Sequence, residues 1–326
     1  YSVKDILKIQ VAPALGCTEP VAIALGAAAA VALLPEKTIE RIEIWVDPNI
    51  YKNGMAVSSP GTGGLSGLDM AAALGAVGGD PKLKLEVLEP IDDQAVNTAK
   101  ALLQAGRVKV NLLRDQIGLF IKTIVTGGGH KAESIIEGLH DNVVSLTLDD
   151  QPINDSRPEA KTDQGDSGKR LAKMEKWLRQ RSLDELLALV DDLDDNDLAF
   201  IADGVKVNTE LARYGLKHGC GLGVGRALER LTRQGLIKKD MITAARIMAS
   251  AAADARMAGV KLPAMSSAGS GNHGLTAILP IVAIKDYIEV DERSVLEAIG
   301  LSHILTAYVK SHTCLLYTSP SPRDHG

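Results

Sequence analysis

Aromatic residues are scarce in this chain, at 3% of its 326 residues. Proteins that bind single-stranded nucleic acid stack bases on aromatic side chains, and proteins that bind duplexes present a basic stripe. The formal net charge of this chain is −5, and no such stripe of Lys and Arg occurs along it. The composition therefore predicts no nucleic acid partner.

Cysteines are few as well, and apolar runs of membrane length are lacking. The three cysteines, at positions 17, 220 and 314, form no disulfide framework, which indicates a reducing cytoplasm. The apolar run from Val21 to Leu34 is shorter than the roughly 20 residues that cross a bilayer. We therefore predict a cytoplasmic protein that has no membrane partner.

The sequence pattern predicts an α+β fold, with an N-terminal mixed helix and strand region followed by a mainly helical catalytic region. In residues 1–150, Thr18 caps a helix that continues to Leu33, and apolar and polar residues alternate over 39–46. The polar stretch 151–169 contains Pro and Gly and is the predicted linker. Further strands are predicted at 108–112, 119–126 and 143–148, and further helices at 69–76, 94–104, 198–214, 225–233, 240–257 and 293–310. The helical region is predicted to cover 170–313.

Residues 314–326 do not continue this pattern. They follow no periodicity and have no relation to the helical segment before them. They look like translated sequencing-adapter read-through. We therefore predict that 314–326 is a non-native tail, that the chain is a C-terminally truncated fragment, and that the fragment is inactive.

The stretch 266–274 has the composition of a ligand-binding loop. Its glycines allow the backbone to approach a ligand closely, and Ser270, Gly271 and Asn272 offer donors for a carboxylate. His273 adds a group that can change charge near neutral pH. The alternative is a plain glycine-rich turn before the apolar run 275–284.

Two further segments contain candidate site residues. Cys17 stands just before a predicted helix, whose N-terminal field favours a thiolate although Glu19 opposes it; the alternative is a small buried residue. The segment after the strand 39–46 is polar and rich in glycine, and it offers the candidate substrate ligands Asn53, Ser58, Gly61 and Thr62. A plain turn is the alternative there.

These segments, together with 253–257 and 262–265, resemble the L-cysteine desulfidase family, which is related to the alpha chain of iron–sulfur L-serine dehydratases. The resemblance runs from about Ile9 to Thr313. It implies β-elimination of L-cysteine to pyruvate, ammonia and hydrogen sulfide, with a [4Fe–4S] cluster as Lewis acid and Cys17 in the active site. The cluster's ligand cysteines are expected downstream of Thr313, so no metal ligand is predicted in this fragment.

Several alternatives remain open. L-serine is the close alternative substrate, and the base that removes the α-proton is either Cys17 or His273. The stretch 270–274 also resembles the carboxylate loop of pyridoxal-phosphate β-eliminating lyases, although Lys261 lies too near to be their Schiff-base lysine. A non-catalytic amino-acid-binding protein is the remaining alternative. In each case the expected partner is a small amino acid, and homo-oligomerisation is left open.

Overall fold

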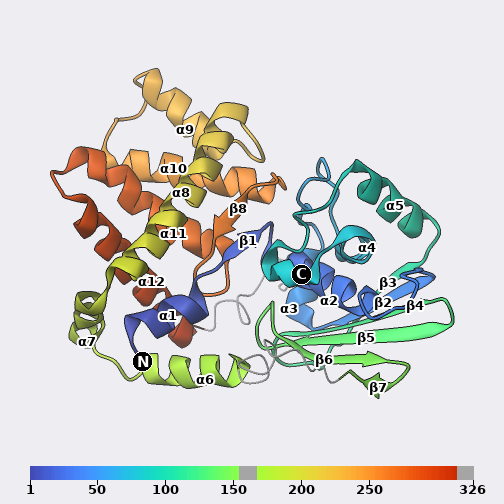
Figure 1. The fold of residues 1–326 in the computed structure, drawn as a ribbon. Coiled ribbons are helices and arrows are strands. Elements are labelled where there is room, and N and C mark those ends of the chain that lie inside the picture. Colours follow the sequence, from blue (N-terminus) through green and yellow to red (C-terminus); the bar gives the residue numbers. More distant parts are fainter. Residues whose placement is uncertain (154–166, 314–326) are drawn as a thin grey trace.

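The computed structural model describes residues 1–153 and 167–313, and it has the predicted α+β fold (Figure 1). The predicted tail 314–326 and most of the predicted linker lie outside the described residues. Of the linker, residues 151–152 form a short strand and residues 167–169 begin a helix. The domain boundaries themselves stay a prediction.

A six-stranded mixed sheet forms the centre of the N-terminal part, in the order β3-β2-β4-β5-β6-β7. Only β2 and β3 run parallel; the other neighbouring strands run antiparallel. In β2, burial alternates along the strand, as the sequence pattern predicted. The strands are β2 Arg41–Val46, β3 Val108–Leu112, β4 Phe120–Gly127, β5 His130–Glu137, β6 Val143–Leu148 and β7 Gln151–Pro152.

Helix α2 is buried along its whole length and lies against this sheet (Figure 1). Ser134 on β5 donates a hydrogen bond to the carbonyl oxygen of Gly26 at 2.7 Å, which fixes the helix over the strand. Helix α4 packs on α2 so closely that a Cβ on Gly75 would lie 2.1 Å from the carbonyl oxygen of Ala24. The helices of this part are α2 Thr18–Val31, α3 Pro48–Gly54, α4 Leu68–Gly78 and α5 Asp93–Gln104, with a short 3₁₀ helix at Pro81–Glu86.

The second part is helical and has its own hydrophobic clusters. Its helices are α6 Ser167–Leu178, α7 Leu183–Ala188, α8 Asp195–His218, α9 Val224–Arg233, α10 Met241–Met257, α11 Gly271–Ile284 and α12 Glu292–Thr313. Figure 1 shows that helix α1, Val3–Gln10, lies with this helical part, and Val3, Ile6 and Leu7 belong to its core. The first helix of the chain therefore packs against α12, the last helix that the structure describes.

Strands β1 (Pro13–Leu15) and β8 (Pro263–Met265) pair antiparallel and join distant parts of the sequence. Strand β1 leads into Cys17, and β8 leads into the glycine-rich stretch. Asn208 of α8 is fully buried and fixes β8 in place: it accepts from the backbone N–H of Met265 at 2.8 Å and donates to its carbonyl at 3.2 Å. This short ribbon brings two candidate loops of the sequence into one region.

The expectation of a ligand loop directly after the strand 39–46 was wrong for its first part. Residues Pro48–Gly54 form helix α3, so Asn53 lies on a helix. Asp47 caps this helix by accepting from the N–H groups of Asn49 and Ile50, and Pro48 occupies its first turn. An Asp followed by Pro is a helix-start signal that was visible in the sequence.

Candidate active site

Cys17, and not Thr18 as predicted, is the N-cap residue of α2; Thr18 is the first residue of the helix, and no side chain caps it. The Cys17 thiol faces the side chain of Glu19. The Cys17 Sγ donates to Glu19 Oε2 at 2.9 Å. Burial, together with the negative charge of Glu19, raises the pKa of the Cys17 thiol to about 12. Although a helix N-terminus favours a thiolate, these two effects are larger, so Cys17 is a protonated thiol at neutral pH.

Glu19 is a buried carboxylate surrounded by donors. Besides the Cys17 thiol, it accepts from the Thr18 hydroxyl at 3.2 Å and from the Asn53 amide at 3.3 Å. Burial alone would raise the pKa of Glu19, but the charge that His140 carries when protonated, the hydrogen bonds from the Cys17 thiol and from the backbone N–H of Glu19, and the positive charge of Arg256 outweigh it, so the pKa is lowered. Glu19 is therefore ionised, and it is the acceptor in its hydrogen bond with Cys17.

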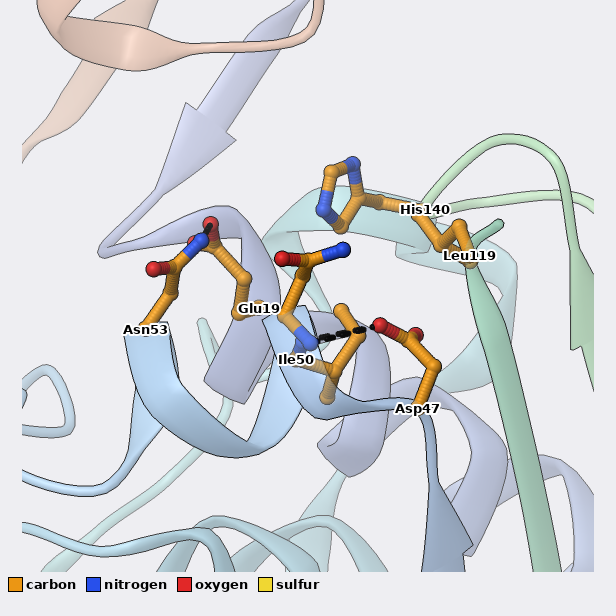
Figure 2. A pocket seen from close by; sticks show the side chains of 7 residues that line it. Glu19, Asp47, Ile50, Asn53, Leu119 and His140 are labelled. Atoms are coloured by element: carbon orange, nitrogen blue, oxygen red, sulfur yellow. Dashed lines mark hydrogen bonds between the residues drawn. The ribbon is translucent and has the colours of Figure 1, made fainter. Parts of the chain in front are cut away.

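Figure 2 shows Glu19, Asn53 and His140 around a small cavity between α2, α3 and the loop after β5. The cavity measures about 10 Å³, roughly the space that one water needs. It is too small for an amino acid. His140 is buried, and burial lowers its pKa, so its imidazole is neutral at neutral pH.

Replacing Glu19 by Gln is expected to lower the pKa of the Cys17 thiol, because the substitution removes the negative charge that opposes the thiolate. Alkylation of Cys17 by iodoacetamide should then be faster at a given pH between 7 and about 9, since the thiolate is the nucleophile. Mass spectrometry of the Cys17 peptide measures this rate. The Cys220 peptide in the same sample is the control and should react unchanged; an unchanged Cys17 rate would contradict the assignment of Glu19.

The glycine-rich stretch forms a tight loop that is fixed at both ends. Ser267 and Ser270 exchange backbone hydrogen bonds at 3.0 Å, and Ala268 donates to the carbonyl of Gln10 at 2.8 Å. Buried His303 of α12 lies 2.9 Å from the Ser267 hydroxyl, and burial lowers its pKa to about 4, so it stays neutral. The loop is therefore held in one shape before any ligand binds.

The loop leads into α11, whose first residues are Gly271, Asn272 and His273. Ser270 is the N-cap residue, but its side chain makes no capping hydrogen bond. The Nδ1 atom of His273 is buried and has no hydrogen-bond partner among the described residues. Burial lowers the pKa of His273, so its imidazole is neutral at neutral pH and can accept a proton. His273 also lines a largely apolar cavity of about 490 Å³ between α11 and α12.

Arg256, in the last turn of α10, joins the Cys17 segment to this loop. It is buried, with 3% of its surface exposed. Its Nη2 donates to the carbonyl oxygen of Gly16 at 2.8 Å, and its Nη1 donates to Asn272 Oδ1 at 3.0 Å. The residue before Cys17 and the residue before His273 are thus held by one guanidinium.

The predicted ligands Ser58, Gly61 and Thr62 lie in the loop between α3 and α4. Thr62 donates its hydroxyl proton to the Ser59 carbonyl at 2.7 Å and accepts from the Leu65 N–H at 3.1 Å, which closes the loop on itself. Gly61 has a positive φ of 72° and donates its N–H to the carbonyl of Gly259, just after α10. These contacts place the loop next to the C-terminal end of α10, and a role in binding substrate stays a prediction.

The described residues do not form a site for a [4Fe–4S] cluster. Such a cluster needs at least three thiolates if one iron is left open, and the described cysteines are Cys17 and Cys220. Cys220 follows α8 and packs with the cluster of Leu211, Leu275 and Leu279. Among residues 1–153 and 167–313, no group of three or more His, Cys, Asp and Glu is placed to hold a metal ion.

The structure thus joins two sets of predicted residues. Cys17 and Asn53 both bind Glu19, and Asn272 is linked through Arg256 to the residue preceding Cys17. Glu19, His140 and Arg256 were not among the predicted site residues. Only Glu19 had a signal in the sequence, a charged residue within a segment that becomes buried; the positions of the other two depend on how distant segments pack.

Comparison with known proteins identifies the family. The model of the serine dehydratase alpha chain family matches residues 82–317. The chain is 60% identical over 314 residues to a UPF0597 protein of Desulfatibacillum aliphaticivorans, covering 96% of this chain and 71% of that protein. It is 42% identical over 308 residues to the UPF0597 protein YhaM of Salmonella typhi, covering 93% and 69%. The chain belongs to the serine dehydratase alpha chain family.

No solved structure matches this chain significantly. In the part of the chain that the structure describes, none of the helices combines the length and apolar character required to cross a membrane.

Proposed function

We propose that the protein splits L-cysteine by β-elimination into pyruvate, ammonia and hydrogen sulfide. The observation that supports this most is the convergence on Arg256: the loop before Cys17 and the start of α11 are hydrogen-bonded to the same buried guanidinium. A thiol, a neutral imidazole and a glycine-rich helix start therefore lie around one cationic centre. These are groups that an elimination from an amino acid requires: proton carriers and a carboxylate site.

In this proposal the first turn of α11 binds the substrate's carboxylate. Its N–H groups, the Ser270 hydroxyl and the Asn272 amide are donors, and the helix dipole favours an anion there. Gly271 lets this turn lie directly against Arg256, since a Cβ at that position would be 2.3 Å from the guanidinium Nε.

The removal of the α-proton is assigned to His273, and the stabilisation of the leaving group to Cys17. Neutral His273 accepts the proton from the substrate's Cα, and the Cα–Cβ double bond forms as the Cβ–S bond breaks and its electron pair leaves with sulfur as hydrosulfide. Cys17, which its raised pKa keeps as a protonated thiol, donates a hydrogen bond to the departing hydrosulfide. The resulting aminoacrylate tautomerises and is hydrolysed by water to pyruvate and ammonia.

The family is associated with iron–sulfur enzymes, and a [4Fe–4S] cluster is part of this proposal. Cys17 and Cys220 supply at most two thiolates, so we place the ligand cysteines downstream of Thr313. The roles of Cys17 and His273 above do not depend on the position of the cluster.

L-serine is the second candidate substrate, because the matching family is described as the serine dehydratase alpha chain. The roles of His273 and Cys17 would be the same, with hydroxide leaving in place of hydrosulfide. The pyridoxal-phosphate alternative gains no support from Lys261, the lysine nearest the loop in sequence, since its amine donates to the carbonyl of Ile91 at 2.8 Å.

An anaerobic assay of the full-length protein tests the proposal. Incubation with L-cysteine is expected to release hydrogen sulfide and pyruvate in equal amounts, and incubation with L-serine to release less pyruvate. Iron and acid-labile sulfide should be present, and pyridoxal phosphate should not be released on denaturation. If the protein releases pyruvate from L-serine but no sulfide from L-cysteine, then L-serine is the substrate. If neither amino acid gives a product, the proposed function is overturned.

A further inference from the structure

Arg256 carries a buried positive charge that no acidic side chain pairs directly among the described residues. Its hydrogen bonds go to neutral acceptors: the Gly16 carbonyl, Asn272 Oδ1 and, at 3.8 Å, the sulfur of Met257. Its Nε is buried and makes no hydrogen bond in the described part of the chain. Burying a guanidinium without a paired carboxylate is costly. Because burying its charge costs free energy, the Arg256 guanidinium is a candidate for a role at the site.

The contact between Arg256 and Asn272 decides which way the Asn272 amide faces. A guanidinium has only donors, so it can be approached only by the oxygen of the amide. Oδ1 of Asn272 lies 3.0 Å from Nη1. The NH₂ group of Asn272 must then point away from Arg256, where its only close contact among the described residues is the weak acceptor sulfur of Met257, at 3.8 Å. Asn272 therefore turns its NH₂ group, whose one close contact is that sulfur, toward its surroundings.

The second contact of Arg256 ties this amide to the Cys17 segment. Nη2 donates to the carbonyl of Gly16 at 2.8 Å. Gly16 has a φ of 85°, and a Cβ there would lie 2.5 Å from Pro60, so the turn before Cys17 has little freedom. With Gly271 against its Nε, the guanidinium is fixed from three sides. Its position thus sets the distance between Asn272 and Cys17.

We infer that Arg256 is the residue that positions Asn272 to recognise the substrate's carboxylate. It holds the Asn272 amide with its NH₂ group turned toward an acceptor ligand, and it keeps that ligand in register with Cys17. The inference rests on the proposed function, because it takes an amino acid to be the ligand. It predicts that Arg256 acts through Asn272, so that loss of either residue removes the same interaction.

A double-mutant cycle tests this in the full-length protein, with L-alanine as a ligand that has the carboxylate but no leaving group. Isothermal titration gives its dissociation constant for wild type, Arg256→Gln, Asn272→Ala and the double variant. A hydrogen bond to a charged group corresponds to about a tenfold to hundredfold change in affinity. Each single variant is expected to show such a loss, and the double variant no more than Asn272→Ala alone.

Controls separate positioning from folding. Arg246→Gln, on the exposed side of the same helix, should bind L-alanine as wild type does. If Arg256→Gln does not fold, Arg256→Lys replaces it in the cycle: a lysine keeps the charge but lacks the fork that reaches both acceptors. Arg256→Lys should bind with intermediate affinity, and its loss should again disappear in the Asn272→Ala background. In turnover of L-cysteine the loss should appear mainly in KM.

The outcomes distinguish this inference from the proposed function. If wild type binds L-alanine but the Arg256 variants bind equally well, or if their losses add fully to that of Asn272→Ala, the positioning role is wrong while the function stands. If wild type binds neither L-alanine nor L-serine nor L-cysteine, the proposed function is overturned, and the role of Arg256 with it. Losses of affinity that are not additive in the double variant support the inference.

Discussion

Replacing Cys17 by Ala in the full-length protein is expected to lower the turnover number for L-cysteine by about a hundredfold to a thousandfold, the usual cost of removing one hydrogen-bond donor to a developing anion. The thiol is the group that donates to Glu19 Oε2 at 2.9 Å, and its pKa, raised to about 12, keeps the proton on sulfur. Without that donor, the negative charge that forms on the leaving sulfur loses a stabilising hydrogen bond. Steady-state kinetics with L-cysteine measures the loss.

Two further variants show whether this loss belongs to the thiol. Cys17→Ser keeps a donor next to Glu19 and should recover part of the turnover, whereas Cys220→Ser should leave turnover nearly unchanged. Iron content should be the same in all of them, because the proposed ligands lie downstream of Thr313. If iron is lost from Cys17→Ala while the fold persists, Cys17 is a cluster ligand; if turnover is unchanged, Cys17 is outside the chemistry.

Replacing Gly75 by Ala is expected to destabilise the N-terminal part of the protein by about 3 kcal/mol, the upper end of the range for overpacked cores. The new Cβ would lie 2.1 Å from the carbonyl oxygen of Ala24, and backbone cannot rotate away as a side chain can. Helices α2 and α4 must therefore separate. The gain of about 1 kcal/mol in helix propensity from Gly to Ala does not offset this. Urea unfolding measures the change in the free energy of unfolding.

Gly78→Ala, in the same helix, is the matched control. Its Cβ would meet no backbone atom within 4 Å, only Ile91 Cδ1 at 3.1 Å and Ala95 Cβ at 3.2 Å, so the free energy of unfolding should change by no more than about 1 kcal/mol. Because α2 begins with Thr18 and Glu19, a displaced α2 should also change the alkylation rate of Cys17 in Gly75→Ala. Equal stability of the two variants would show that the close helix contact is wrong.

Local pattern was sufficient for most of the secondary structure. The predicted helix from Thr18, the strand at 39–46 and the helices at 225–233 and 240–257 agree closely with α2, β2, α9 and α10. Each is encoded by short-range signals: a cap, an alternation or a 3.6-residue period. The strand β5 was not among the predicted strands, and helix α3 was interpreted as a loop.

Only part of the candidate site could be predicted from such local patterns. Cys17, Asn272 and His273 could be singled out because their residue types are rarely needed for folding in such glycine-rich surroundings. The protonation state of Cys17, however, could not be predicted from the sequence. The helix start at Cys17 favours a thiolate, but burial of the thiol beside Glu19 keeps it protonated. Burial and the distance to a neighbouring charge are properties of the packed molecule.

By itself, the sequence determined the family and the α+β class and singled out the two candidate site segments, because composition and motif are local properties of the chain. Tertiary structure alone decided that these segments meet. The pairing of β1 with β8 and the hydrogen bond from Arg256 to Gly16 join residues about 240 to 250 positions apart. No short-range pattern encodes a contact of that separation, since it depends on the packing of α8, α10 and α11 against one another.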